Sequence, residues 1–144
     1  MVEKDTVIER QYYKGLAWVA SMALFMQSLD ATILNTALPT IATDLQTPVF
    51  EMQMAIIAYS LAVALFIPLT AWAAAKFGTL TVFRSAVFTF VFGSVACAMA
   101  TSLETLVLAR ILQGIGGAFM MPVARLAIIQ TVPKNQLINA WNLM

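Results

Sequence analysis

The sequence contains no histidine, a single cysteine and few charged residues. Only 10% of its 144 residues are charged, whereas soluble domains carry about 25%. Without histidine, the commonest metal ligand and the commonest general base are missing, so we expect no metal site, no cofactor and no enzymatic chemistry. The lone Cys97 can form no disulfide within the chain and is interpreted as a packing residue. The net charge of +1 gives no basic surface for nucleic acid.

Apolar residues make up 61% of the chain, which is more than a body of this size can bury. A helix needs about 20 mostly apolar residues to cross a hydrocarbon core about 30 Å thick. Four stretches meet this requirement, at residues 16–38, 52–75, 82–101 and 103–132. We therefore predict an all-α, polytopic transmembrane helical bundle with four spans, a tail at residues 1–15 and a segment at 133–144 that leads toward a fifth span.

Three prolines fall inside or beside these stretches. Pro39 is expected to close the first span. Pro68 and Pro122 each remove a backbone donor, so they are expected to kink the second and fourth spans.

Lysine and arginine gather on one side of the predicted membrane. The tail, the second connection and the segment after the fourth span contain lysine or arginine, whereas the first and third connections carry acidic charges only. Because basic residues favour the cytoplasmic side, we expect both termini in the cytoplasm. The basic residues of this pattern are Lys4, Arg10, Lys14, Lys76, Arg84 and Lys134.

Apart from Arg84 and Glu104, which flank the connections, three charged residues lie within the predicted spans, namely Asp30, Arg110 and Arg125. Each costs about 2.5–3.5 kcal/mol at mid-membrane, so such residues are usually paired or hydrated. Asp30 lies about 21 Å into the first span, and Arg110 about 10 Å into the antiparallel fourth. The two opposite charges are thus expected at similar depth, as an intramembrane pair requires. Two alternatives stay open: Asp30 bonded to Thr or Asn, and Arg125 snorkelling to the headgroups.

One face of the fourth span carries both arginines together with small residues. At about 100° per residue, positions 110, 114, 117, 121 and 125 fall within a sector of about 80°. Gln113 lies one turn from Arg110 on the flank of this face. Gly114 and Gly117 would let another helix approach closely, and simple helix packing is the alternative to cavity lining.

Two motifs resemble a known family. Residues 29–39 read L-D-A-T-I-L-N-T-A-L-P, similar to the first-span signature L-D-x-T-I-x-N-x-A-L-P of the fourteen-span drug/proton antiporters. These form a branch of the major facilitator superfamily. Residues 106–118 read L-V-L-A-R-I-L-Q-G-I-G-G-A and resemble that superfamily's fourth-span motif R-x-x-Q-G-x-G-x-A. The resemblance covers essentially the whole chain and implies the first four spans, a partial N-terminal half, of a major-facilitator fold.

The resemblance also implies a site and an activity. Asp30 would take part in proton and substrate coupling, and Arg110 would be the buried cation that tunes proton movement. The resemblance implies that Gln113, Gly114, Gly117 and Asn35 pack helices or line the cavity. The implied activity is proton-coupled export of hydrophobic or cationic small molecules across the inner (plasma) membrane.

The sequence departs from the family in two places. In the connection between the second and third spans, Lys76 and Gly78 match the family's loop motif, but Ala71 and Ala75 replace its Gly and Asp, and Leu80 replaces a basic residue. We expect this to weaken the cytoplasmic latch that the loop forms in the family. The chain also stops where a fifth span should begin. We therefore expect a truncated or split carrier that is inactive alone and assembles with a C-terminal carrier fragment in the lipid bilayer.

Two other hypotheses remain. The chain could be a complete four-span exporter that works as a homodimer, as small multidrug exporters do with a single acidic residue in the first span. It could instead be a non-transporting membrane partner that docks onto another carrier through the small residues of its fourth span.

Overall fold

The computed structural model describes residues 2–131, whose regular elements are all helices. They are α1 (Val2–Asp44), α2 (Val49–Phe66), α3 (Leu69–Phe77), α4 (Thr79–Ala98) and α5 (Leu103–Thr131). Four segments are long and apolar enough to cross a membrane, namely Ala17–Asp44, Val49–Phe66, Thr79–Ala98 and Leu103–Ala127. The predicted all-α bundle with four spans is confirmed, and the chain is a multi-pass membrane protein. The predicted segment 133–144, with Lys134, lies outside the described residues.

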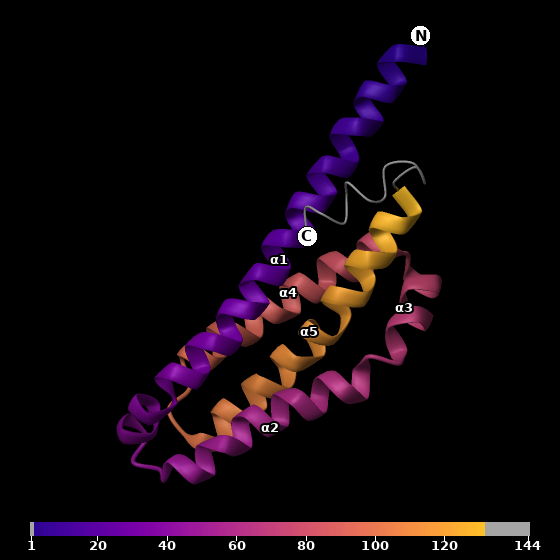
Figure 1. Cartoon of the computed structure of the whole chain (residues 1–144). Coiled ribbons are helices and arrows are strands. Elements are labelled where there is room, and N and C mark those ends of the chain that lie inside the picture. The colour runs from indigo at the N-terminus through magenta and orange to yellow at the C-terminus, as the bar shows by residue number, and fades with distance from the viewer. Residues whose placement is uncertain (1, 132–144) are drawn as a thin grey trace.

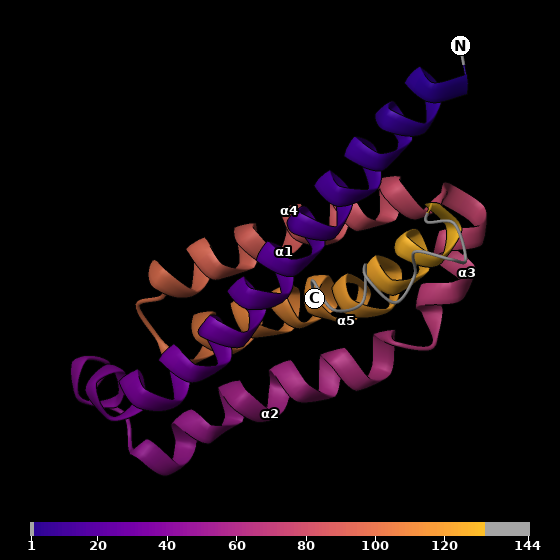
Figure 2. The ribbon, with the colours of Figure 1, turned by 45° about the horizontal axis from the view of Figure 1, so that its top comes forward.

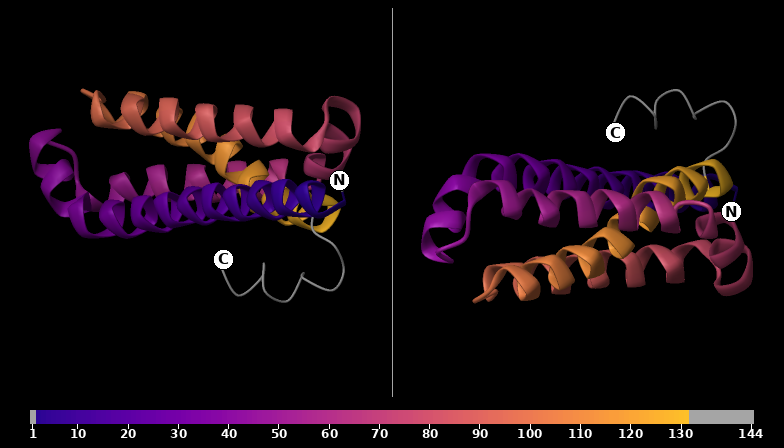
Figure 3. Two further views of the ribbon diagram at one scale, coloured as in Figure 1. Left: turned by 90° about the horizontal axis from the view of Figure 1, so that it is seen from above. Right: turned by 90° about the horizontal axis from the view of Figure 1, so that it is seen from below.

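The spans alternate in direction (Figures 1 and 2). The connections α1–α2 and α4–α5 lie at one end of the bundle, and the N-terminus and α3 lie at the other (Figure 1). Helix α5 is central, because 56% of its apolar window is buried, against 22% in α1, 17% in α2 and 28% in α4. It packs on α1, α2 and α4, as the views from above and below in Figure 3 also show. The residues of α5 therefore determine how the other spans pack around it.

Helix α1 is longer than the predicted span 16–38. It begins in the polar tail at Val2 and continues through Pro39 to Asp44. A proline inside a helix costs about 3 kcal/mol. Ending the helix within lipid would instead leave several backbone groups without partners, so the helix persists past the proline. The chain then turns at Gln46, which has a φ of 52°.

The predicted span 52–75 is divided into two helices at Pro68. Helix α2 ends at Phe66 and α3 begins at Leu69. Proline has no N–H to donate, and its ring clashes with the carbonyl one turn earlier, which ends α2. The turn between the two helices is held at Ile67, whose carbonyl accepts both the backbone N–H of Thr70 at 3.1 Å and the Thr70 hydroxyl at 2.7 Å. These bonds keep one carbonyl at the break paired inside the membrane. Pro122, in contrast, lies within α5.

A single glycine separates α3 from α4. Gly78 has a φ of 84°, a conformation that glycine adopts at little cost. Its N–H donates to the Ala74 carbonyl at 3.0 Å, and its own carbonyl accepts from the N–H of Val82 at 3.1 Å. The second connection is therefore a tight turn, which holds α3 and α4 close to each other.

Helices α4 and α5 approach each other at two glycines. A Cβ atom at Gly116 would lie 2.6 Å from the backbone nitrogen of Phe90 and 2.8 Å from the carbonyl oxygen of Ala86. A Cβ atom at Gly93 would lie 2.8 Å from backbone atoms of Gln113. Both distances are shorter than real Cβ contacts. Close packing of small residues is a principal source of helix association in lipid, so these glycines set the spacing of α4 and α5.

Candidate intramembrane ion-pair site

Asp30 of α1 and Arg110 of α5 form an ion pair inside the bundle. The Arg110 Nη1 donates to the Asp30 Oδ2 at 2.7 Å, across 80 positions of sequence. The Arg110 side chain is 6% exposed and that of Asp30 is 15% exposed. Asp30 lies about 20 Å along the span that begins at Ala17, and Arg110 about 10 Å along the antiparallel span that begins at Leu103. Both charges are therefore at similar depth, and the structure brings them into contact.

The pair is only partly satisfied by its neighbours. The Arg110 Nε is buried and has no hydrogen-bond partner among the described residues. A buried arginine that keeps a free donor is poised to bind another acceptor, because an unsatisfied polar group in an apolar interior costs about 1–3 kcal/mol. The site can therefore exchange partners more readily than a fully satisfied salt bridge could.

A second polar contact lies one turn from Asp30. The Gln27 Nε2 of α1 donates to the Tyr59 hydroxyl of α2 at 3.2 Å, and the Gln27 Oε1 is buried without a partner in the described chain. The sequence analysis did not single out either residue. Gln27 precedes Asp30 by three positions, which places both on one helix face and could have revealed it. Tyr59 carries no such signal, since aromatic residues are common in membrane spans.

Gly114 and Gly117 make room for Tyr59. A Cβ atom at position 114 would lie 2.8 Å from the Tyr59 carbonyl oxygen, and one at 117 would lie 2.9 Å from the Tyr59 hydroxyl and 3.2 Å from the Gln27 Nε2. The glycine face of α5 thus packs against α2 and leaves space for the bond between Gln27 and Tyr59.

We expect Tyr59→Phe to weaken the bundle by about 1 kcal/mol, because Gln27 loses its partner while the ring still fills the same space. The measurement is the unfolding free energy in detergent micelles. Gln27→Leu combined with Tyr59→Phe completes a double-mutant cycle. Strictly additive effects of the two changes would show that the hydrogen bond contributes nothing.

Gln113 is fully buried and faces α4. Its Oε1 accepts a hydrogen bond from the Cys97 thiol, with Sγ 3.5 Å away, and its Nε2 has no partner among the described side chains. Cys97, interpreted as a packing residue, therefore also donates a weak hydrogen bond. Gln113 lies on the flank of the Arg110 face, on the side toward α4 rather than α1.

The remaining predicted residues lie away from the pair. Asn35 is exposed on α1, and Arg125 is exposed on α5. Lys76 and Gly78 are exposed at the α3–α4 turn. The Lys76 Nζ lies 4.9 Å from the ring centroid of Trp72 and 5.4 Å from that of Phe77. Among residues 2–131 no three metal-ligating side chains of the His, Cys, Asp or Glu type come together.

Comparison with known proteins agrees with this geometry. The family model of the Major Facilitator Superfamily matches residues 20–144, which include all four spans and the ion pair. The chain belongs to the major facilitator superfamily. This is a transporter family, so the described bundle is a partial major-facilitator fold. The family resemblance drawn from the two motifs is confirmed.

Two relatives illustrate the range of similarity within the major facilitator superfamily. The chain is 83% identical over 136 residues to "Probable transport protein HsrA" of Haemophilus influenzae, covering 94% of this chain and 29% of the relative. It is 46% identical over 119 residues to "Putative multidrug resistance protein MdtD" of Yersinia pestis, covering 83% of this chain and 26% of the relative. The chain thus spans less than a third of the curated relatives it matches. No solved structure matches it.

Proposed function

We propose that these four spans belong to a proton-coupled exporter of hydrophobic or cationic compounds, and that Asp30 and Arg110 couple proton to substrate. The observation that carries this proposal is the 2.7 Å ion pair between a buried arginine and a partly buried aspartate of different spans. Ionisable residues inside a membrane are costly, and where they occur they commonly mark ion or proton paths.

The coupling follows from the requirement that a buried charge has a partner. When Asp30 is ionised, Arg110 neutralises it. A proton on Asp30 removes its charge and releases Arg110, and a cationic compound beside Asp30 would compete with Arg110 in the same way. A protonated carboxylate is neutral and attracts a cation only weakly. Protonation of Asp30 and binding of a cationic compound beside it therefore exclude each other. Mutual exclusion at one site is what an antiporter needs.

Transport itself requires a path between two halves of a carrier. The described spans form part of one half, and the relatives above are more than three times as long as the matched region. We therefore propose that transport takes place in a carrier that combines these spans with further ones. We propose that the carrier lies in the inner membrane with both termini of this chain in the cytoplasm, an orientation that the positions of its lysines and arginines support.

A chimera tests the role of Asp30. The 136 matched residues would replace the corresponding segment of the H. influenzae relative, to which they are 83% identical. Cells that express it should extrude a fluorescent cationic dye in a manner abolished by a protonophore. Asp30→Asn should reduce the efflux to the level of cells without the carrier, because asparagine can neither ionise nor exchange a proton.

Asp44→Asn is the matched control, because Asp44 is exposed at the far end of the same helix. It should leave efflux unchanged. Full efflux with Asp30→Asn at equal expression would reject the coupling role. Dye efflux driven by the 144-residue chain alone would reject the requirement for further spans.

A further inference from the structure

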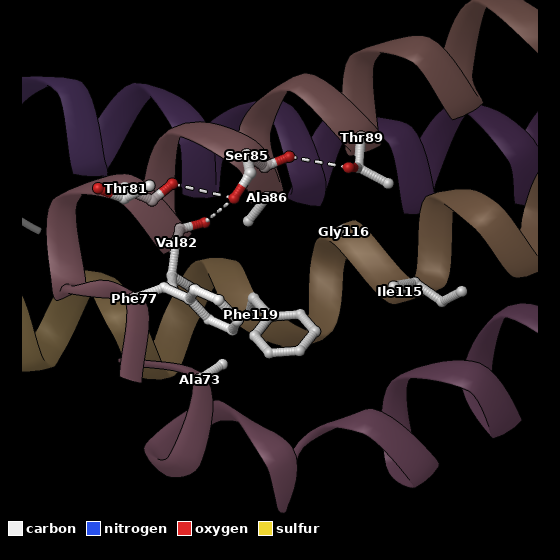
Figure 4. A pocket seen from close by; sticks show the side chains of 10 residues that line it. All are labelled: Ala73, Phe77, Thr81, Val82, Ser85, Ala86, Thr89, Ile115, Gly116 and Phe119. Carbon is white, nitrogen blue, oxygen red and sulfur yellow. Dashed lines mark hydrogen bonds between the residues drawn. The ribbon is translucent and has the colours of Figure 1, made fainter. Parts of the chain in front are cut away.

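A groove lies between α3, α4 and α5, away from the ion pair (Figure 4). Its volume is about 330 Å³, which is in the range of sites that bind small molecules. Its walls come mainly from Phe77, Thr81, Ser85, Thr89, Ile115 and Phe119. We call it the α3–α5 groove. Neither Asp30 nor Arg110 lines it, so the proposed coupling site does not account for it.

The groove surface suits hydrocarbon. Ser85 and Thr89 face it from α4, but their hydroxyls donate to carbonyls of their own helix (Figure 4). The Ser85 Oγ is 2.9 Å from the carbonyl oxygen of Thr81, and the Thr89 Oγ1 is 2.8 Å from the carbonyl oxygen of Ser85. Most of the other lining side chains are apolar. An apolar chain can therefore fill the groove without taking these donors away from a partner, which would be costly in lipid.

Two basic residues are next in sequence to residues that line the groove. The Lys76 Nζ is 5.4 Å from the ring centroid of Phe77, which lines the groove. Arg84 is exposed on α4, directly before the groove residue Ser85. Among the side chains that the structure describes, neither cation is in an ion pair. Asp44, Glu51 and Glu104 lie at the helix ends on the opposite side of the bundle, and the other acidic residues outside the spans, Glu3, Asp5 and Glu9, belong to the N-terminal tail.

We propose that the α3–α5 groove binds one acyl chain of an anionic phospholipid, whose headgroup phosphate is held by Lys76 and Arg84. The lipid belongs to the leaflet on the side of the N-terminus, where the α3–α4 turn lies (Figure 1). Basic pockets between membrane helices recognise anionic headgroups. A zwitterionic lipid would fill the groove without matching its two cations, and a soluble anion would match the cations without filling the groove. Only an anionic lipid does both.

Trp72 is a built-in reporter for this lipid. Its ring centroid is 6.0 Å from that of Phe77, and the Lys76 Nζ lies over it at 4.9 Å. Lipids with brominated acyl chains quench tryptophan fluorescence on contact. A chain carrying Trp18→Phe and Trp141→Phe retains Trp72 alone and can be reconstituted in phosphatidylcholine vesicles that contain a small, fixed fraction of brominated lipid.

We expect brominated phosphatidylglycerol to quench Trp72 more strongly than brominated phosphatidylcholine at equal mole fraction. Trp18 is the matched control, because it is 63% exposed, against 57% for Trp72, and lies at the same end of the bundle. A chain that retains only Trp18 should be quenched equally by both lipids. Equal quenching of Trp72 by the two lipids would overturn the proposal.

Arg84→Gln should lower the preference of Trp72 for phosphatidylglycerol by about fivefold, the factor expected for one basic residue at an anionic surface. This variant leaves the contact between Lys76 and Trp72 in place. An unchanged preference would exclude Arg84 from the headgroup site and contradict the proposal. Circular dichroism of each variant verifies that its helices are retained.

Two further measurements distinguish the contribution of the groove from that of the basic residues, and a lipid from a soluble phosphate ester. Ser85→Leu places a bulky side chain in the groove while both cations remain, so it should abolish the preference. If the preference survives, general attraction of lipid to the basic end explains the binding and the groove does not. Excess soluble glycerol 3-phosphate should leave the quenching unchanged, and relief of quenching would identify a site for free phosphate esters instead.

Discussion

Replacing Arg110 with leucine is expected to lower the unfolding free energy of the bundle by about 3–5 kcal/mol, the usual effect of removing one partner of a buried ion pair. The Asp30 carboxylate would remain among apolar side chains with only 15% of its side chain exposed. The unfolding free energy can be measured by titrating the micelle-solubilised chain with sodium dodecyl sulfate and following its helical circular dichroism.

The matched control removes both charges. Arg110→Leu combined with Asp30→Asn leaves no buried charge, so it should recover much of the loss, because a neutral replacement of a buried pair is often well tolerated. If the double variant is as unstable as the sum of the single ones, the packing of the arginine stem, and not its charge, explains the loss. An unaffected Arg110→Leu variant would mean that the pair makes no contribution to stability.

Gly116→Ala should separate α4 from α5 and destabilise the chain by about 1–3 kcal/mol, as overpacking in a tight core does. The new Cβ would lie 2.6 Å from the Phe90 nitrogen and 2.8 Å from the Ala86 oxygen. Both atoms are backbone, so no side-chain rotation can relieve the clash. The helices themselves must move. The same micelle titration measures the effect.

Gly15→Ala is the control for this change. Position 15 is also within a helix, but a Cβ there has nothing within 4 Å. Alanine favours a helix over glycine by up to about 1 kcal/mol, so this variant should be as stable as the original chain or more so. Equal stability of the Gly116→Ala and Gly15→Ala variants would show that α4 and α5 can accommodate an added methyl group where they are closest.

The sequence predicted the framework better than the details of the site. Hydropathy and the placement of lysine and arginine are sufficient for four antiparallel spans, because lipid imposes both rules on every helix. Matched depth favoured a contact between Asp30 and Arg110, since a buried charge in lipid needs a partner, but it left a bond from Asp30 to Thr or Asn open. The bond between Gln27 and Tyr59 does not follow, because neutral polar residues can satisfy themselves locally or with water. Finding it requires knowing which faces of α1 and α2 meet.

The prolines also show that local structure could not be predicted fully from the sequence. Pro39 and Pro68 have the same covalent chemistry, yet α1 continues through the first and α2 ends before the second. At Pro68 the backbone N–H and the hydroxyl of Thr70 both donate to the Ile67 carbonyl, which stabilises the turn at the break. For Gln113, helical periodicity gave its angle relative to Arg110 but not the helix it would face. Which helix Gln113 faces depends on the close approach of α4 at Gly93, and this cannot be predicted from the periodicity of α5 alone.

The central position of α5 has a consequence for how the protein is made. Ribosomes add about 5–20 residues per second, so the 80 positions from Asp30 to Arg110 correspond to about 4–16 s of synthesis. During that interval the nascent chain has already presented α1 to the insertion machinery, and its acid has no arginine to meet. Until α5 is inserted, α1, α2 and α4 lack the helix that packs between them. The insertion of α5 supplies these contacts and gives Asp30 its arginine partner. Insertion of α5 therefore completes the contacts among the four described spans.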